Sequence, residues 1–178
     1  CFHGPLVAGE FAAGLSPRSQ AHLFSLLTGG MGEERLVFRT TIQSGVAEGQ
    51  LLGGCLSVLV ATLGTPFAFD PAGAILFLED IDEKPYRIDR MLTQLKQAGL
   101  LEHLGGVVFG ELPGCWGEGD DPALLLSVIA DAFADYAYPV GFGLPAGHGG
   151  ENLALPLGTH VRLDTEKKQL DFLEPAVT

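Results

Sequence analysis

Two stretches of the chain carry residues that could perform acid–base chemistry, and the first surrounds a histidine. His148 stands between Gly147 and Gly149 in the glycine-rich segment 147–158, which also contains Asn152. Glycine permits backbone conformations that bring a loop close to another group, and loops on a rigid scaffold often carry catalytic side chains. An imidazole presented in this way could act as a general base. A surface turn that merely contains a histidine is the alternative interpretation.

The second stretch is a short apolar run that ends in acidic residues. Ile75-Leu76-Phe77-Leu78 follows a Pro/Gly turn and is typical of a buried strand. Open α/β sheets place their chemistry at the carboxyl ends of strands. Glu79 is therefore positioned to orient a histidine that serves a nucleophile, as in a catalytic triad. The acidic residues that follow, Asp80, Asp82 and Glu83, are better explained as a loop that caps the next helix.

The composition indicates one well-buried domain, or one domain and a piece of another. The 178 residues are 47% hydrophobic, and no apolar run approaches the length of a membrane span. The net charge of −12 argues against nucleic acid and anionic membranes as partners. Three cysteines, Cys1, Cys55 and Cys115, form neither a disulfide framework nor a zinc motif. A reducing cytoplasm fits this pattern best.

Three regions are expected along the chain. Ser16-Pro17 predicts a helix start with Ser16 as the N-cap, and residues 1–32 have the length of a loop and one helix, the tail of a larger domain. Residues 33–48 are polar and β-branched, and we expect a linker that turns into strands. Residues 49–178 would then form the main domain.

Strands and helices alternate in this main domain. Pro85 begins an amphipathic helix from Tyr86 to Ala98. The other expected elements are a short helix from Leu56 to Leu63, strands at Val107–Gly110 and Tyr138–Phe142, a helix from Pro122 to about Tyr136, and a hairpin of His160–Asp164 with Gln169–Phe172. This pattern predicts an α/β fold with a mixed sheet that could curl into a partial barrel.

Four motifs occur in an order that is typical of one family. They are Gly53-Gly54-Cys55-Leu56 with Leu63-Gly64-Thr65-Pro66, Ile75 to Asp80, Pro85 to Leu92, and Gly147-His148 to Leu157-Gly158. With these motifs the chain resembles the LD-carboxypeptidase family, serine peptidases that include muramoyltetrapeptide carboxypeptidases and microcin C self-immunity peptidases. The resemblance runs from His3-Gly4-Pro5 to the carboxyl end.

The resemblance implies a fold and a reaction. Such enzymes have a flavodoxin-like amino-terminal domain and a carboxyl-terminal domain of the swivelling β/β/α type, with a Ser-Glu-His triad. By motif position, Glu79 would be the triad carboxylate and His148 the general base. The parent enzyme would release the terminal D-alanine from the L,D bond of a murein tetrapeptide in peptidoglycan recycling, with no metal and no cofactor.

The chain departs from the family pattern in two places. None of its serines stands in a Gly-x-Ser-Asp-like elbow, so the resemblance implies a carboxyl-terminal portion whose nucleophile lies in a missing amino-terminal domain. Such a portion should be inactive alone, because a general base without its nucleophile has little to activate. Cys55 stands where the family usually has Asn. Family members are often dimers, so a homodimer is one expected assembly.

Three residues are candidates for substrate binding. Arg87 lies near the acidic loop, although a salt bridge on the helix surface explains it equally well. Asn152 could hydrogen-bond the substrate, but a role in the His148 loop is the better explanation. Trp116 could line a substrate pocket or pack against the base of its own loop.

Two alternatives to a fragment of a serine peptidase stay open at this point. Cys1 could be the nucleophile of an N-terminal-nucleophile hydrolase, which is activated by its own α-amino group. The chain could also be a non-catalytic domain that retains a peptide-binding surface, or one half of a split enzyme. The sequence leaves open whether the substrate is a murein peptide or a peptidyl nucleotide.

Overall fold

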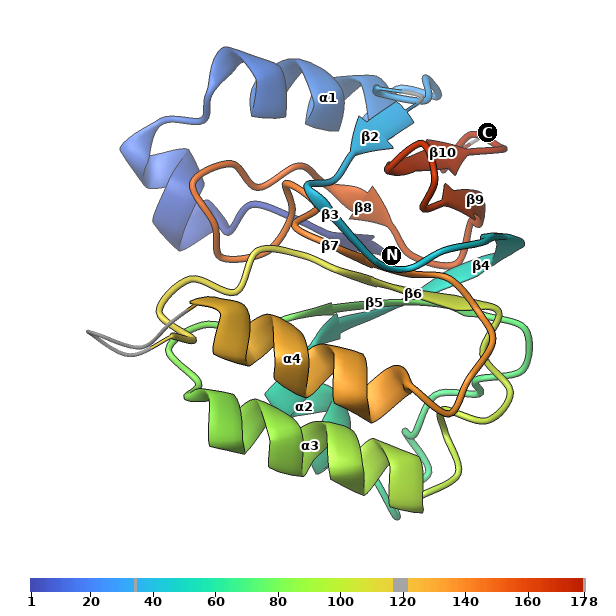
Figure 1. Ribbon diagram of the computed structural model, residues 1–178. Coiled ribbons are helices and arrows are strands. Elements are labelled where there is room, and N and C mark those ends of the chain that lie inside the picture. The colour runs from blue at the N-terminus through green and yellow to red at the C-terminus, as the bar shows by residue number, and fades with distance from the viewer. Residues whose placement is uncertain (34, 117–121, 178) are drawn as a thin grey trace.

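Parallel and antiparallel strands share one sheet in this protein (Figure 1). A computed structural model describes residues 1–33, 35–116 and 122–177. Within them, eight strands hydrogen-bond in the order β2–β10–β9–β4–β5–β6–β7–β3. The strands are β2 (Arg35–Val37), β3 (Thr40–Gln43), β4 (Val46–Cys55), β5 (Ile75–Glu79), β6 (Gly106–Phe109), β7 (Val140–Phe142), β9 (His160–Asp164) and β10 (Gln169–Phe172). Strands β4 to β7 run parallel and the others pair antiparallel, so the predicted mixed sheet is confirmed.

Strand β4 belongs to both the parallel and the antiparallel part of the sheet. Its residues Val46–Gln50 pair antiparallel with β9, and Leu51–Cys55 pair parallel with β5. Gly53, in the second half, has a φ of 131°, and a Cβ atom there would lie 1.9 Å from the carbonyl oxygen of Phe77. Glycine is therefore required where the two backbones approach this closely.

The sheet curls until its two edges come close together. Strands β2 and β3 are outermost in the order, yet only Phe38 and Arg39 separate them along the chain. The Phe38 N–H donates to the Lys168 carbonyl and the Arg39 N–H to the Phe142 carbonyl, each at 3.0 Å. Because consecutive Cα atoms are about 3.8 Å apart, the two edges lie close together. This is the partial barrel that the strand pattern allowed.

Residues 33–48, expected to be a linker that turns into strands, contain β2, β3 and the first residues of β4. Leu36 and Phe38 are 0% and 2% exposed and pack inside the curled sheet with residues such as Leu163. The segment therefore shares its core with the strands that follow it, and this shared core limits its freedom as a connector.

Three helices cover one face of the parallel strands (Figure 1). They are α2 (Leu56–Ala61), α3 (Pro85–Gln97) and α4 (Pro122–Phe133). Helix α3 begins at Pro85, whose missing N–H costs nothing at a first helical position. Ile88, Leu92 and Leu95 are fully buried on one side of it, so the predicted amphipathic helix is confirmed. None of the helices in the described ranges has the length and apolarity that crossing a membrane requires.

The alternation of side chains along β5 decides which way Glu79 points. Leu76 and Leu78 pack in the core between the sheet and the helices, whereas Ile75 and Phe77 pack in the core on the opposite face. Successive side chains of a strand point to opposite faces. Glu79 therefore shares the face of Phe77, away from the three helices.

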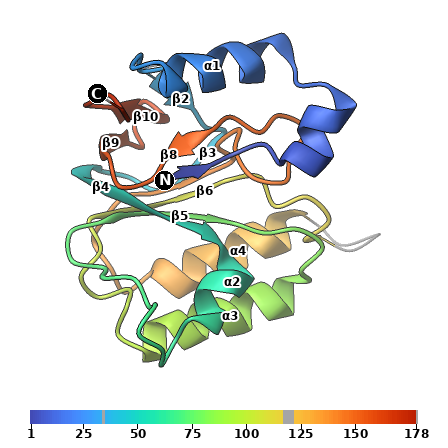
Figure 2. The same ribbon diagram turned by 180° about the vertical axis from the view of Figure 1, so that it is seen from behind.

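The first residues of the chain pack on that opposite face (Figure 2). Strand β1 (Phe2–His3) pairs antiparallel with β8 (Leu155–Pro156). A one-turn π-helix, η1 (Val7–Phe11), and then α1 (Pro17–Leu27) follow. The Ser16 hydroxyl accepts a hydrogen bond from the Ser19 N–H at 3.0 Å, which confirms the predicted N-cap. This segment brings His3 to the carboxyl end of β5.

Candidate active site

Glu79 and His148 form a close hydrogen-bonded pair at the carboxyl end of β5. The Oε2 atom of Glu79 lies 2.7 Å from the ring Nδ1 of His148 and also accepts the His148 backbone N–H at 3.2 Å. The Glu79 side chain is fully buried, whereas 40% of the His148 side chain is exposed. A buried carboxylate thus holds an imidazole whose remaining edge can reach a reactant.

The glycines around His148 allow this approach. Gly147 has a φ of 101°, and a Cβ atom there would lie 2.7 Å from Glu79 Oε2. Asn152 holds the same loop: its Oδ1 accepts the Gly147 N–H at 3.1 Å, and its Nδ2 donates to Glu10 Oε1 at 3.0 Å. In this structure Asn152 therefore fixes the loop backbone, the role that we considered the better explanation.

The surroundings of Glu79 keep its carboxyl group ionised at neutral pH. Burial alone raises its pKa, but the hydrogen bonds from His3 and His148 lower it, and the net pKa lies below the ordinary value. An ionised carboxylate can only accept hydrogen bonds, so Nδ1 of His148 must carry the proton. In neutral His148 this leaves Nε2 unprotonated, the tautomer that a general base needs.

A second imidazole reaches the same carboxylate. His3 Nε2 lies 3.4 Å from Glu79 Oε1, and the His3 ring meets Phe77 edge-on with centroids 5.1 Å apart. In the sequence, His3-Gly4-Pro5 contributed only to the family resemblance. Because His3 and Glu79 are 76 residues apart, no local pattern pointed to their contact.

Two of the cavities that adjoin the His148 loop differ in size and position. One of about 220 Å³ lies at the imidazole and is lined by Phe2, His3, Gly4, Leu6, Glu10, Gly147, His148 and Asn152. The other, of about 640 Å³, lies beyond residues 149–151 and has Trp116 and Arg39 among its lining residues. Trp116 is 39% exposed there. The larger cavity has room for several residues of a peptide.

Glu111 supports the loop from the next strand. Its Oε2 accepts the Gly150 N–H at 3.0 Å, and its Oε1 is hydrogen-bonded to the Arg39 guanidinium. Glu111 was not among the site residues predicted from the sequence. The sequence feature that could have identified it is the one that identified Glu79: a carboxylate just after a buried apolar strand, here Val107–Gly110.

The acidic loop after β5 caps a different helix from the one predicted. Asp80 is 3% exposed, and its Oδ2 accepts the Ser57 N–H at 2.9 Å, near the start of α2, the helix before β5. The prediction of a cap on the following helix was therefore wrong for Asp80. The parallel pairing of β4 with β5 brings the start of α2 beside the end of β5, which sequence proximity does not show.

The remaining predicted residues have defined surroundings. Arg87 pairs with Glu83 at 3.2 Å on the surface of α3, so its guanidinium is engaged there. Cys55 is opposite Glu79 in the β4–β5 register, and its Sγ lies 3.2 Å from Ser57 Oγ. Cys1 is exposed, and its amino group donates to the Leu157 carbonyl at 3.3 Å.

Three of the serines occupy the helical positions expected from the sequence. Ser16 is the N-cap of α1, Ser57 lies in α2, and Ser127 lies in α4 with its hydroxyl donating to the Leu124 carbonyl at 2.8 Å. Asp120 and Asp121, the two residues before the helix predicted from Pro122, lie outside the described residues. Among the residues that are described, no three His, Cys, Asp or Glu side chains gather where they could hold a metal ion.

A buried carboxylate against a partly exposed histidine is a pair that hydrolases with a catalytic triad also contain. Residues 48–163 match the family profile described as LD-carboxypeptidase C-terminal domain. The match covers more than half of the chain, and the chain therefore belongs to the LD-carboxypeptidase family.

Curated relatives extend this match. The chain is 37% identical over 172 residues to a probable murein peptide carboxypeptidase of Bacillus subtilis, which covers 94% of this chain and 54% of the relative. It is 34% identical over 167 residues to the murein tetrapeptide carboxypeptidase of Pseudomonas aeruginosa, and this match covers 88% of this chain and 53% of the relative. The chain thus spans about half the length of the curated relatives it matches.

Solved structures show the same fold. A muramoyltetrapeptide carboxypeptidase from Oxalobacter formigenes is similar with a TM-score of 0.78 and 32% identity, covering 96% of this chain and 60% of that one. The microcin C7 self-immunity protein MccF is similar with a TM-score of 0.77 over 99% of this chain and 61% of that one. At 20% identity, the likeness to MccF concerns the fold alone.

Proposed function

We propose that this chain is the carboxyl-terminal part of a serine LD-carboxypeptidase that releases the terminal D-alanine of a murein tetrapeptide. The observation that carries the proposal is the 2.7 Å hydrogen bond between the buried carboxylate of Glu79 and the ring of His148. The relatives named as murein peptide carboxypeptidases support the substrate class. A role in peptidoglycan recycling in the cytoplasm belongs to the same proposal.

In the proposed mechanism His148 is the general base. Its Nε2 takes the proton of a serine hydroxyl, supplied by an amino-terminal domain, as the serine attacks the carbonyl carbon of the L,D peptide bond. The same nitrogen then returns the proton to the leaving amine of D-alanine as the peptide C–N bond breaks, and water hydrolyses the remaining acyl-serine ester with the same general base. Glu79 keeps Nδ1 protonated and stabilises the imidazolium that forms between the two steps.

The larger cavity is the place we propose for the body of the peptide. It begins at Gly149, next to the base, and has Trp116 in its wall. Arg18 and Arg39 also line it; Arg18 is paired with two glutamates and Arg39 with one. Because these ion pairs already engage both guanidinium groups, the apolar part of the wall would contribute most to the affinity for the peptide.

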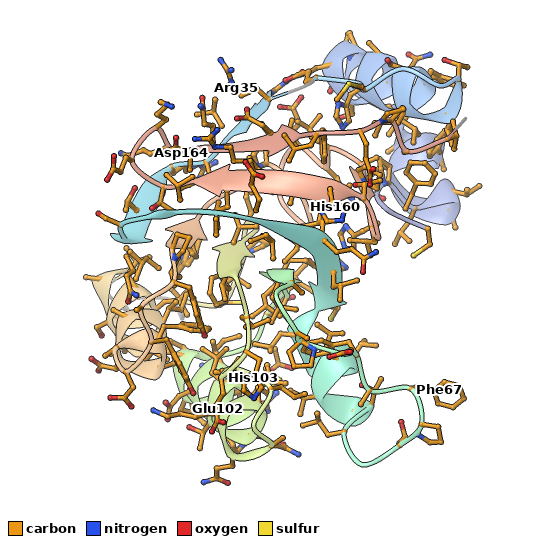
Figure 3. The ribbon with its side chains drawn as sticks, turned by 90° about the vertical axis from the view of Figure 1, so that its right-hand side faces the viewer. Arg35, Phe67, Glu102, His103, His160 and Asp164 are labelled. Atoms are coloured by element: carbon orange, nitrogen blue, oxygen red, sulfur yellow. The ribbon has the colours of Figure 1, made fainter. Side chains whose placement is uncertain are left out.

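The proposal is tested by release of D-alanine from murein tetrapeptide by the whole enzyme, the chain together with its serine-bearing domain. His148→Gln should lower kcat by about 10⁴-fold or more, because the proton acceptor is lost. His160→Gln is the matched control, since His160 is an exposed histidine on β9 (Figure 3). It should leave kcat unchanged.

Normal turnover by His148→Gln would overturn the assignment of the base. A peptidyl nucleotide, assayed beside the tetrapeptide, separates the two substrate classes. Hydrolysis of the nucleotide alone would overturn the murein substrate but retain His148 as the base. The 178-residue chain by itself should release no D-alanine, and turnover by this chain alone would contradict a nucleophile on another domain.

A further inference from the structure

Two histidines near the start of the chain use their ring nitrogens differently. His22 is buried, and both of its nitrogens meet backbone groups: Nε2 lies 2.8 Å from the Ala154 carbonyl, and Nδ1 accepts the Glu33 N–H at 2.8 Å. A structural histidine satisfies its ring in this way. The ring of His3 instead has one hydrogen-bond partner among the described residues, the carboxylate of Glu79, at Nε2.

The other ring nitrogen of His3, Nδ1, indicates that the ring does more than pack against Phe77. Nδ1 is buried and has no hydrogen-bond partner among the described residues. An unpaired buried polar atom costs free energy, and an apolar side chain could pack against Phe77 without that cost. The contact of Nε2 with Glu79 is therefore the interaction that an imidazole provides here and an apolar side chain would not.

The carboxylate of Glu79 divides its two oxygens between the histidines. Oε2 accepts both the ring Nδ1–H and the backbone N–H of His148, while Oε1 faces His3 Nε2 at 3.4 Å. Rotation of the carboxylate would break contacts on both sides at once. A donor at Oε1 thus restrains the orientation in which Oε2 meets His148.

We propose that His3 is a positioning residue for the catalytic pair: it donates its Nε2–H to Glu79 Oε1 and holds the carboxylate in the orientation that fixes His148. This inference rests on the proposed role of Glu79. His3 acts through Glu79 and leaves the substrate to other residues. An ionised Glu79 requires the proton of His3 to be on Nε2, which makes Nδ1 the unpaired lone pair.

The contact also affects the protonation of Glu79. The hydrogen bond from His3 is the first of the influences that lower the pKa of Glu79 against the effect of burial, followed by the hydrogen bond from His148. When their rings are protonated, His3 on β1 and His148 in its loop also lower the pKa of Glu79 by Coulomb attraction. On the neighbouring strand β4, the residue that pairs with Glu79 in the sheet is Cys55.

The first test is a ¹³C NMR titration of the Glu79 carboxyl group in the 178-residue chain. His3→Leu removes the donor but keeps apolar packing on Phe77, whereas His3→Gln places an amide N–H near the position of Nε2. His22→Gln is the control, a buried histidine of the same segment that does not contact Glu79. Amide signals of the β1–β8 pair report whether each variant keeps its local fold.

The pKa of Glu79 should rise in His3→Leu, because the carboxylate loses a donor, and should return toward the wild-type pKa in His3→Gln. His22→Gln should leave it unchanged. An unchanged titration in a folded His3→Leu variant would overturn the proposal. The same is true if His3→Gln fails to restore the wild-type pKa, or if His22→Gln shifts it equally.

The second test uses the whole enzyme and tetrapeptide hydrolysis. His3→Leu should lower kcat about tenfold or more, the scale of one lost hydrogen bond to a charged group, with KM unchanged. His3→Gln should recover most of kcat. A rise in KM alone would indicate a substrate contact and overturn the positioning role. The NMR titration does not depend on turnover, so failure of the proposed function and failure of this inference can be told apart.

Discussion

Glu79 and Glu111, at the ends of two neighbouring parallel strands, hold the same loop two residues apart. Glu79 is the last residue of β5 and accepts the His148 N–H at 3.2 Å, and Glu111, just beyond β6, accepts the Gly150 N–H at 3.0 Å. The carboxyl ends of parallel strands lie at one edge of a sheet. Two carboxylates at this edge therefore fix the backbone on both sides of the His148 ring.

Removal of the second support should loosen the loop. Glu111→Ala leaves the Gly150 N–H and the Arg39 guanidinium without their partner, so amide exchange at Gly150 should become faster, by about tenfold for one lost hydrogen bond. Glu111→Gln keeps an acceptor for the Gly150 N–H and should exchange more slowly than Glu111→Ala. Equal exchange at Gly150 in the wild type and Glu111→Ala would contradict the support that we assign to Glu111.

The lowered pKa of Glu79 predicts how stability depends on pH. A carboxyl group whose pKa is lower in the folded state stabilises the fold fully above its ordinary pKa of 4.5, and this contribution is lost as the pH falls through the folded-state pKa. Glu79→Gln should therefore have a lower free energy of unfolding at pH 7, by about 1–2 kcal/mol. The difference from wild type should shrink below pH 4.5.

Urea unfolding of both proteins across this pH range checks the prediction. Glu166→Gln, in the exposed turn between β9 and β10, is the control and should follow the wild-type curve. A constant difference between wild type and Glu79→Gln at every pH would show that the carboxylate is not stabilised in its ionised form.

Removal of the Asp80 carboxylate that caps α2 should lower the stability of the protein. Asp80→Ala removes the acceptor of the Ser57 N–H and that of the Ile81 N–H, both at 2.9 Å. Loss of a helix cap costs about 1–2 kcal/mol, which should appear in the free energy of unfolding. Asp89→Ala, at an exposed position of α3, should change that free energy by less than about 0.5 kcal/mol. Equal effects of the two substitutions would rule out the cap.

The position of Trp116 in the wall of the larger cavity predicts that its substitution affects substrate affinity. If the peptide contacts the wall of the larger cavity, Trp116→Ala should raise KM about tenfold and change kcat little, because a binding contact is lost rather than a catalytic group. Phe67→Ala is the control, since Phe67 is 83% exposed and projects from the loop after α2 (Figure 3). An unchanged KM would leave packing on its own loop as the role of Trp116.

Local chemistry made much of the fold predictable. The Ser16 cap, the proline that begins α3 and the final hairpin depend on residues a few positions apart, and the structure has all three. The alternation of strands and helices likewise follows from hydrophobic periods of two and 3.6 residues. The position of Glu79 at the end of a buried strand could be read from its neighbours alone.

Tertiary structure decided which distant residues meet. The His3–Glu79 and Glu79–His148 contacts join residues 76 and 69 positions apart, and the curl that joins β2 to β3 comes from strand pairing across the whole chain. Such contacts depend on the order and register of strands, which local periodicity does not encode. Local sequence thus predicted the main helices, several of the strands and the types of reactive residue, whereas only the packing of the sheet placed two imidazoles on one carboxylate.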